Sequence, residues 1–268
     1  MLALIDGDIL LYRIGFTTEN ETEEWIPKHR FDDLVDSILN ETQATNYQVW
    51  LSDSTENNYR RQYYPAYKAN RVQPKPRHYQ LLKDHAIANW GAAITPKQEA
   101  DDALGIEQVK WNEDAASFLS RYNSHQIEAT HKLKAVPPQT VICTIDKDLK
   151  QIPGQHYNFV KKEWDSVTED EGRRYFYRQL LTGDATDNIQ GCPKIGSARA
   201  DKIIGSITTE RELFECCRSG YYSAYAKHIY KTDTLDEEQK EFIDAQILMN
   251  GRMVRIRQQE GEIWHFPQ

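Results

Sequence analysis

The sequence lacks any long hydrophobic run. Its apolar stretches are only a few residues long, such as Ile9-Leu10-Leu11, whereas a helix that crosses a bilayer needs about 20 consecutive apolar residues. The first residues lead directly into the apolar stretch at residues 2–5 without a basic leader, so we expect no secretory signal peptide. These absences predict a cytoplasmic protein without a membrane partner.

Cysteine is also scarce, and its spacing is not that of a metal site. No two cysteines form a C-x-x-C pair, and the four are Cys143, Cys192, Cys216 and Cys217. The two adjacent residues are poorly placed to form a disulfide with each other. We therefore expect reduced thiols and no structural zinc.

Low-complexity tracts are absent as well, which argues against a disordered chain. Hydrophobic residues make up 39% of the sequence, with 6 Trp, 15 Tyr and 8 Phe, and this is enough for a packed core. A length of 268 residues predicts one large α/β domain or a core domain with a smaller appendage.

Positive charge is concentrated in one segment of an otherwise acidic chain. The formal net charge is −8, which by itself argues against a nucleic-acid partner. Between residues 59 and 97, the single acid Asp84 is outnumbered by Arg60, Arg61, Lys68, Arg71, Lys75, Arg77, Lys83 and Lys97. Because the distribution of charge matters more than its sum, this segment keeps nucleic acid as a candidate partner.

Acidic residues come at the ends of the segments that are expected to form strands. Four short apolar segments have the pattern of strands, at residues 2–5, 47–51, 141–145 and 157–160. With the helical spacing at residues 31–40, this alternation predicts an α/β fold, a mostly parallel sheet flanked by helices. Ligands bind beyond the carboxyl ends of such strands, so we expect Asp6, Asp53 and Asp146 in a single site.

Capping patterns predict where further helices begin. Thr95-Pro96-Lys97-Gln98 is typical of a helix start and would place Glu99-Ala100-Asp101-Asp102 in or just after the first turn. The pattern Thr168-x-x-Glu171 predicts a helix that ends at Gly183. From about residue 165 the chain is predicted to be mainly helical, and residues 107–138 to form an insertion or a helical excursion.

Nine acidic side chains fall in five short clusters along the chain. They are Asp6, Asp53, the three acids of Glu99-Ala100-Asp101-Asp102, Asp146 with Asp148, and Asp184 with Asp187. Two carboxylates about 4 Å apart repel by roughly 4 kcal/mol at an effective dielectric near 20. Hard divalent cations relieve this repulsion, and paired ions cleave phosphodiesters. Taken singly, each acid is more often a turn former or a helix cap.

Two further segments have the composition of nucleic-acid contacts. Tyrosines alternate with cations at residues 58–71, where rings can stack on unpaired bases and cations neutralise phosphates; the alternative is an exposed loop whose tyrosines pack on the core. Gly191 and Gly196 bracket a turn that can present backbone N–H groups to a phosphate, flanked by Arg199 and Lys202. Its alternative interpretation is a packing element between two helices.

Five motifs follow one another along the chain: Ile5-Asp6-Gly7, Tyr67-Lys68-Ala69-Asn70-Arg71, Glu99-Ala100-Asp101-Asp102, Thr144-Ile145-Asp146-Lys147-Asp148-Leu149 and Gly183-Asp184-x-x-Asp187-Asn188-Ile189-x-Gly191. The resemblance that they carry is to the structure-specific 5′-nucleases, which include flap endonucleases, phage 5′→3′ exonucleases and the 5′-nuclease domain of bacterial DNA polymerase I. It implies a PIN-like nuclease core at residues 1–164 with a helical arch at about 59–90. It also implies a mainly helical DNA-binding region at 165–268 with a helix-three-turn-helix at about 183–205.

The resemblance also implies a role for each acidic cluster. Five acids match the more tightly held metal site: Asp6, Asp53, Glu99, Asp101 and Asp146. Three match the second site: Asp148, Asp184 and Asp187. Asp102 matches an acid that acts through water. Asp8 departs from the family pattern, in which a small or neutral residue is common, and no role follows for it.

For DNA, the resemblance implies that Lys68 and Arg71 contact the scissile phosphate and that Tyr67 stacks on the terminal base. The further DNA contacts expected from the basic segment and the glycine turn are Arg60, Arg61, Gly191, Lys194, Gly196, Arg199 and Lys202. Main-chain carbonyls near residues 191–196 are implied to hold a potassium ion.

The sequence therefore predicts a metal-dependent 5′→3′ exonuclease or flap endonuclease. We expect two Mg²⁺ ions, with Mn²⁺ as a substitute, and a monomer that acts on DNA with 5′ ends, flaps or junctions. Because the sequence contains no polymerase segment, we expect a free-standing phage-type enzyme of replication or recombination. The alternatives are a PIN-type ribonuclease and a non-catalytic binder of DNA junctions.

Overall fold

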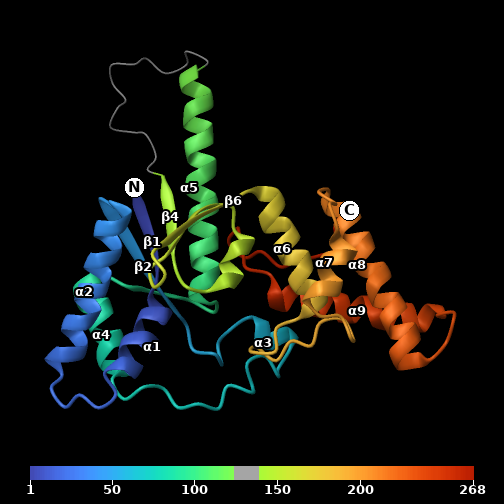
Figure 1. Cartoon of the computed structure of the whole chain (residues 1–268), viewed down its shortest axis with the longest axis horizontal. Helices are drawn as coiled ribbons and strands as arrows, with labels where there is room; N and C mark the ends of the chain where they lie inside the picture. The colour runs from blue at the N-terminus through green and yellow to red at the C-terminus, as the bar shows by residue number, and fades with distance from the viewer. Residues whose placement is uncertain (124–138) are drawn as a thin grey trace. The chain divides into compact units, whose positions relative to one another are not determined.

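The computed structural model describes residues 1–123 and 139–268, so residues 124–138 of the predicted insertion lie outside the described part. The chain forms two compact units (Figure 1). The sheet unit comprises Met1–Ser54, Gln73–Val167 and Arg257–Glu260, and the helical unit comprises Thr55–Val72, Thr168–Ile256 and Gly261–Gln268. Residues 55–72, which contain the first part of the predicted arch, therefore pack with the helical unit.

The sheet unit is built on a mostly parallel sheet, as predicted. Its strands are β1 (Leu2–Asp6), β2 (Asn46–Ser52), β3 (Ala93–Thr95), β4 (Thr140–Cys143), β5 (Gly154–Asn158) and β6 (Glu163–Val167). The order is β3-β2-β1-β4-β5-β6, with every neighbouring pair parallel except β5 and β6. β1 lies between β2 and β4, so side chains that follow these three strands emerge at one edge of the sheet.

Helices cover the sheet because β1 and β4 are buried on both faces and β2 is buried at Val49 and Leu51. The helices of this unit are α1 (Gly7–Thr17), α2 (Trp25–Thr42), α4 (Tyr79–Trp90) and α5 (Ala100–Asn123), with the 3₁₀ helix η2 (Lys147–Gln151) after β4. Apolar residues of α1, α2 and α4, among them Leu10, Phe31 and Leu82, form one core with Ile5 and Val49 of the sheet. α5 instead contacts β1, β2 and β4.

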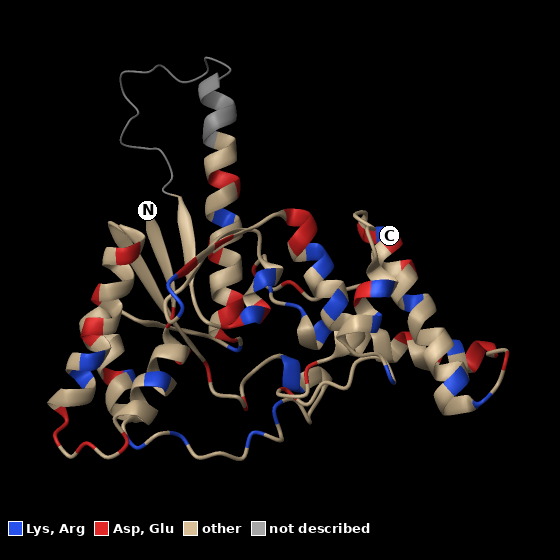
Figure 2. Cartoon of the chain, viewed as in Figure 1, with Lys and Arg blue, Asp and Glu red and all other residues tan. Residues whose placement is uncertain are grey.

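The helical unit has its own core. It contains α3 (Arg60–Tyr63), α6 (Glu169–Thr182), α7 (Ser197–Ile204), α8 (Glu210–Tyr225), the π-helix η3 (Ala226–Tyr230) and α9 (Glu237–Val254). Phe176, Leu213 and Ile243 are buried where α6, α8 and α9 pack together. Trp264 covers α9 at Gly251. α6 begins with acidic residues and continues with arginines (Figure 2), an order that complements the helix dipole at its first turn.

The predicted helix boundaries are correct at α6 and wrong at α5. Thr168 and Glu171 form a capping box at the start of α6. Thr95, in contrast, ends β3, and α5 begins only at Ala100. The Thr95 hydroxyl lies 3.2 Å from the Leu51 carbonyl and 2.9 Å from the Gln98 carbonyl, and Lys97 has a φ of 59°. These contacts hold a turn where the capping pattern alone favours a helix.

Two smaller predictions are also corrected. β5 lies at Gly154–Asn158 rather than at residues 157–160, and β6 was not expected.

The four cysteines are free, as expected. None of the helices in residues 1–123 and 139–268 is long and apolar enough to cross a membrane.

Candidate active site

Asp6 ends the strand at the middle of the sheet, where its carboxylate is buried with a relative exposure of 2%. It caps α1 by accepting from the Ile9 N–H at 3.2 Å and accepts from the Thr144 hydroxyl at 2.7 Å. Burial, followed by the charges of Asp8 and Asp146, raises the pKa of Asp6 to about 7, although these two hydrogen bonds lower it. A buried carboxylate with acidic neighbours is favourably placed for a cation.

Thr144 connects Asp6 to the next strand-end acid, Asp146. Its oxygen accepts from the Asp146 N–H at 3.0 Å. The Asp146 carboxylate in turn caps η2 by accepting from the Asp148 N–H at 2.8 Å. Because β1 and β4 are adjacent and parallel, the structure brings Asp6 and Asp146 to the same edge of the sheet, with Asp148 two residues further along the chain.

Asp53 follows β2 and holds the turn that leads into α5. One carboxylate oxygen accepts from the Lys97 N–H at 2.9 Å, and the other accepts from the Ser54 N–H at 2.7 Å. Its own N–H donates to the Gln98 carbonyl at 3.2 Å. Asp53 is therefore at the same sheet edge, half-buried, and oriented by backbone groups.

Asp102 stabilises the start of α5 and is fully buried, with a relative exposure of 0%. One carboxylate oxygen accepts from the Glu99 N–H at 3.1 Å, and the other accepts from the Arg257 N–H at 3.1 Å. Arg257 also donates from its guanidinium to the Gln98 side chain at 2.9 Å. These contacts give Asp102 a structural role between α5 and residues 257–260, while Glu99 and Asp101 flank it at the helix start. Sequence reasoning missed Arg257, which has no local motif.

Asp184 and Asp187 lie on a closed loop of the helical unit. Gly183 and Gly191 meet at its neck, where a Cβ on Gly183 would come within 2.3 Å of the Ile189 carbonyl. Both glycines have positive φ values, 66° and 65°, a conformation that L side chains rarely adopt. The backbone groups of Asp184 and Ile189 bond to each other at 2.9 and 2.7 Å, so the loop has a defined shape.

The segment with the predicted phosphate contacts is docked on this loop. The Lys68 N–H donates to the Asp187 carbonyl at 3.0 Å, Asn70 donates to the Ala185 carbonyl at 2.8 Å and Asn188 to the Ala66 carbonyl at 2.9 Å. Since these bonds involve backbone on both sides, residues 66–71 and 184–188 form one surface of the helical unit.

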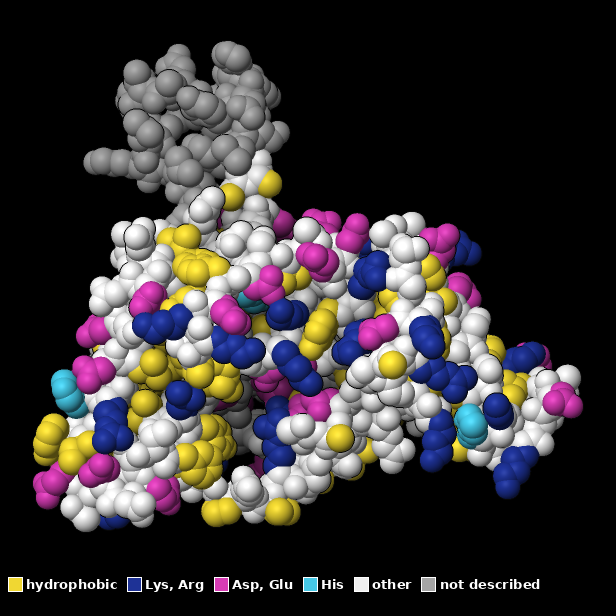
Figure 3. Space-filling view, in the orientation of Figure 1, with side chains coloured by type: hydrophobic (Ala, Val, Ile, Leu, Met, Phe, Trp, Pro, Cys, Tyr) yellow, Lys and Arg dark blue, Asp and Glu magenta, His cyan; other side chains and the backbone are white. Residues whose placement is uncertain are grey.

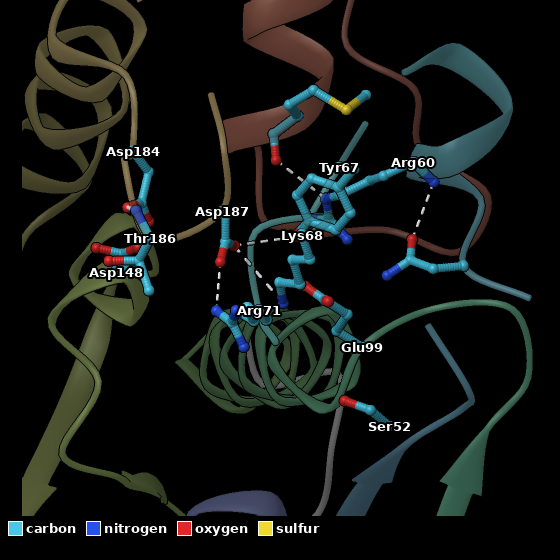
Figure 4. Close-up of polar contacts among 12 residues, drawn as sticks. Ser52, Arg60, Tyr67, Lys68, Arg71, Glu99, Asp148, Asp184, Thr186 and Asp187 are labelled. Carbon is cyan, nitrogen blue, oxygen red and sulfur yellow. Dashed lines mark hydrogen bonds and ion pairs between the residues drawn. The ribbon is translucent and has the colours of Figure 1, made fainter. Parts of the chain in front are cut away.

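The Asp187 carboxylate is surrounded by positive and polar groups (Figure 4). The Lys68 ammonium lies 3.6 Å from one oxygen, the Tyr67 hydroxyl donates to the same oxygen at 3.1 Å, and Arg71 pairs with the other oxygen. The predicted cations Lys68 and Arg71 therefore neutralise a predicted metal ligand. This pairing was not anticipated from the sequence.

Tyr67 and Arg60 do not lie where a direct DNA contact would need them. The Tyr67 ring is 1% exposed, and the Arg60 side chain is 2% exposed. The Arg60 guanidinium donates to the carbonyls of Met253 at 3.0 Å and Arg255 at 2.6 Å. Tyr67 belongs to the core of the helical unit, and Arg60 is buried beside it, which matches the alternative in which the tyrosines of this segment pack inward. Arg61 is half-buried and donates to the Tyr67 carbonyl at 3.2 Å.

The predicted contacts around α7 are at the surface. Lys194, Arg199 and Lys202 are exposed, and Gly196 is the N-cap of α7. Lys194 has a φ of 60°. Exposed cations beside a helix start are suited to phosphate oxygens.

A further surface that sequence reasoning missed lies on α1 and at the start of α4. The rings of Tyr12 and Phe16 are 6.2 Å apart, those of Tyr12 and Tyr79 are 5.4 Å apart, and the Lys75 ammonium lies 4.0 Å from the Tyr79 ring. Tyr12 and Phe16 are 38% and 51% exposed. Hydrophobic side chains gather over this helix in Figure 3. The i, i+4 spacing of the two α1 aromatics was the available signal.

The acids therefore form two groups, one in each unit. The sheet unit holds Asp6, Asp53, Glu99, Asp101, Asp146 and Asp148, and the helical unit holds Asp184 and Asp187. Within residues 1–123 and 139–268, no three acidic, histidine or cysteine side chains lie close enough together to hold a metal ion. The oxygen atoms that these acids offer, with the buried carboxyl group of Asp6 among them, are of the kind that hard divalent cations prefer.

Comparison with known proteins identifies relatives of the chain. No family model matches it. It is 25% identical over 236 residues to the 5′-3′ exonuclease of Halalkalibacterium halodurans, a match that covers 80% of this chain and 73% of that protein. It is also 24% identical over 234 residues to the 5′-3′ exonuclease of Buchnera aphidicola subsp. Schizaphis graminum, covering 80% and 72%. The chain is a homologue of 5′-3′ exonucleases.

The homology extends to DNA polymerase I of Deinococcus radiodurans, with 24% identity over 235 residues. That match covers 82% of this chain and 22% of the polymerase, so the chain spans about a quarter of such relatives. The predicted resemblance to 5′-nucleases and the predicted class of hydrolytic nuclease are confirmed by these homologues.

Solved structures show the same fold. A bacteriophage T5 protein crystallised with metal ions has a TM-score of 0.56 at 15% identity, covering 93% of this chain and 88% of that one. The bacteriophage T5 flap endonuclease, in a pseudo-enzyme-product complex with DNA and metal ions, has a TM-score of 0.52 at 15% identity, covering 93% and 98%. The predicted fold class is thereby confirmed, while the arch and the helix-three-turn-helix stay predictions.

Proposed function

We propose that this 5′-3′ exonuclease homologue hydrolyses DNA phosphodiesters near 5′ ends and flap junctions with the help of divalent metal ions. The observation that carries the proposal is the convergence of Asp6, Asp53 and Asp146 at the ends of three adjacent parallel strands. Buried or half-buried carboxylates in this arrangement are suited to bind Mg²⁺, with Mn²⁺ as a substitute. A role in replication or recombination, such as primer or flap removal, is part of the proposal.

The acids of the sheet unit would hold one ion, with Asp6, Asp146 and Asp53 as ligands and Glu99 and Asp101 beside them. Asp184 and Asp187 of the helical unit would serve a second ion. When bound, such ions make a coordinated water more acidic and offset charge on the reacting phosphate oxygens. Asp102 is not assigned as a direct ligand in this proposal: the resemblance implies that it acts through water, and its two oxygens join the start of α5 to Arg257.

The helical unit would supply the DNA contacts. Lys68 and Arg71 pair with Asp187. We propose that both cations also interact with the scissile phosphate when DNA is bound. The exposed cations Lys194, Arg199 and Lys202 would contact the duplex backbone. On the sheet unit, the aromatic surface of Tyr12, Phe16 and Tyr79 is suited to stack on unpaired bases.

A flap substrate labelled at its 5′ end tests the function. We expect Mg²⁺-dependent cleavage that stops when a chelator is added, since the proposed ligands are all oxygen atoms. A labelled mononucleotide would indicate exonuclease action, and an intact flap would indicate cleavage at the junction. The same substrate made of RNA distinguishes a PIN-type ribonuclease, and binding without cleavage would identify a junction binder.

Two variants assign the role of the carboxylates. Asp146→Asn should lose at least 100-fold in cleavage rate, in the range that removal of an essential charge produces, about 2.7 kcal/mol or more, while DNA binding is retained. Asp114→Asn, which removes an exposed carboxylate of α5, is the matched control. Equal rates for Asp146→Asn and the control in Mg²⁺ would contradict the metal assignment.

A further inference from the structure

Asp8 is the one acid near the strand ends for which neither the motifs nor the proposed function gives a role. It lies in the first turn of α1, where the helix dipole favours a negative charge. β1 pairs with β2 only as far as Asp6 and Trp50, whereas β2 continues to Ser52. The Ser52 N–H therefore lies beyond the last residue of β1 whose carbonyl could accept its hydrogen bond.

The Asp8 carboxylate supplies this missing acceptor. Its two oxygens lie 3.3 and 3.2 Å from the Ser52 nitrogen. Gly7 makes this approach possible, because a Cβ at that position would come within 2.7 Å of the Trp50 carbonyl. The Asp8 side chain thus takes the place of a strand carbonyl at the end of β2, where the N–H of the half-buried Ser52 needs a hydrogen-bond acceptor.

Ser52 passes this restraint on to α5. Its hydroxyl oxygen accepts from the Ala100 N–H at 2.9 Å, one of the N–H groups at a helix start that lack a partner within the helix. Asp53 follows Ser52 in the chain, and Glu99 precedes Ala100. A connected path of two hydrogen bonds therefore runs from Asp8 to the residues next to two proposed metal ligands.

We propose that Asp8 is a positioning residue, which aligns the end of β2 with the start of α5 so that Asp53 and Glu99 are placed for a divalent ion. This inference rests on the proposed function for the identity of the ligands. If Asp8 were itself a metal ligand, binding of the ion would depend on its negative charge. If Asp8 only accepts a hydrogen bond from the Ser52 N–H, a neutral side-chain oxygen is sufficient. Asparagine supplies that oxygen and alanine does not, so the two substitutions separate the roles.

The test measures Mn²⁺ binding to the full chain by calorimetry, without DNA, for the wild type, Asp8→Asn, Asp8→Ala and Ser52→Ala. Substitution of groups that orient metal ligands commonly weakens binding by about 10- to 100-fold. We expect about a 10-fold weaker affinity for Asp8→Ala and Ser52→Ala, and an affinity within about 3-fold of the wild type for Asp8→Asn. Glu237→Gln, which removes an exposed acid in the first turn of α9, is the control.

Amide hydrogen exchange of the metal-free proteins gives a second measurement. Asp8→Ala should speed exchange at Ser52 and Ala100, and Asp8→Asn should restore protection at both. Equal losses of Mn²⁺ affinity in Asp8→Asn and Asp8→Ala would overturn the proposal in favour of a direct ligand. Unchanged exchange at Ala100 in Asp8→Ala would also overturn it, whether or not the ion binds.

Flap cleavage by the wild type is measured in parallel. If the wild type binds Mn²⁺ but does not cleave DNA, and Asp8→Ala weakens binding, the proposed function fails while the positioning role stands. If the wild type cleaves DNA and Asp8→Ala binds Mn²⁺ as tightly as the wild type, the positioning role fails alone.

Discussion

Replacement of Asp6 by asparagine should change how the stability of the metal-free protein depends on pH. Burial and the charges of Asp8 and Asp146 raise the pKa of Asp6 from its ordinary value of 3.8 to about 7. Because the native state holds this proton more tightly than the unfolded state does, the group stabilises the fold at low pH. That contribution is lost as the pH rises from about 4 to 7.

The size of the effect follows from the shift in pKa. A rise from 3.8 to about 7 corresponds to about 4 kcal/mol between the two ends of this pH window. Asparagine has no charge to bury, but it cannot accept from both the Ile9 N–H and the Thr144 hydroxyl with the geometry of the two carboxylate oxygens. The loss of one such hydrogen bond costs about 1 kcal/mol. We therefore expect Asp6→Asn to be about 3 kcal/mol more stable than the wild type at pH 8.

Urea unfolding in the presence of a chelator, at pH 5 and pH 8, measures this difference. At pH 5 the wild type has already lost about 1.6 kcal/mol of this contribution, so the variant should be about 0.6 kcal/mol more stable, and at pH 8 the difference should reach about 3 kcal/mol. Asp114→Asn, which removes an exposed carboxylate, should keep the pH dependence of the wild type. If the free energy of unfolding fell by the same amount between pH 5 and pH 8 in Asp6→Asn and in the wild type, the raised pKa of Asp6 would be refuted as the cause of the pH dependence.

Two further predictions concern packing and polar contacts in the helical unit. Gly251→Ala should lower the free energy of unfolding by about 1–3 kcal/mol or more, because the added Cβ would come within 2.2 Å of the Trp264 ring. Gly220→Ala, whose added Cβ has its nearest contact at 3.4 Å, should lower it less. Urea unfolding of both variants measures the difference. Arg60→Ala should destabilise by about 3 kcal/mol through the loss of buried hydrogen bonds to two carbonyls, and a difference from Arg61→Ala below 1 kcal/mol in urea unfolding would contradict this role.

Local patterns were sufficient wherever neighbours in sequence determine the structure. The apolar segments within β1, β2 and β4 predicted the sheet, and the parallel order then brought Asp6 and Asp146 to the same edge. The capping box of Thr168 and Glu171 also formed as predicted, since both partners lie within one helical turn.

Patterns failed where distant residues compete for the same groups. Thr95 has the sequence context of a helix cap, yet its hydroxyl lies beside the Leu51 carbonyl, 44 residues earlier in the chain. Arg60 looked like a surface cation of a basic segment, but the carbonyls of Met253 and Arg255 hold it in the core. No local spacing signals either contact.

The amino-acid sequence by itself determined the α/β class, the order of the strand-end acids and the resemblance to 5′-nucleases, because these depend on short-range periodicity and on motif order. Tertiary structure alone decided which charges are balanced and by which partners. Asp187 is paired with Lys68 and Arg71, Asp102 is held by the backbone of Arg257, and Asp8 supports Ser52. Each of these contacts joins residues more than 40 positions apart, and burial sets its strength, so only the folded chain specifies them.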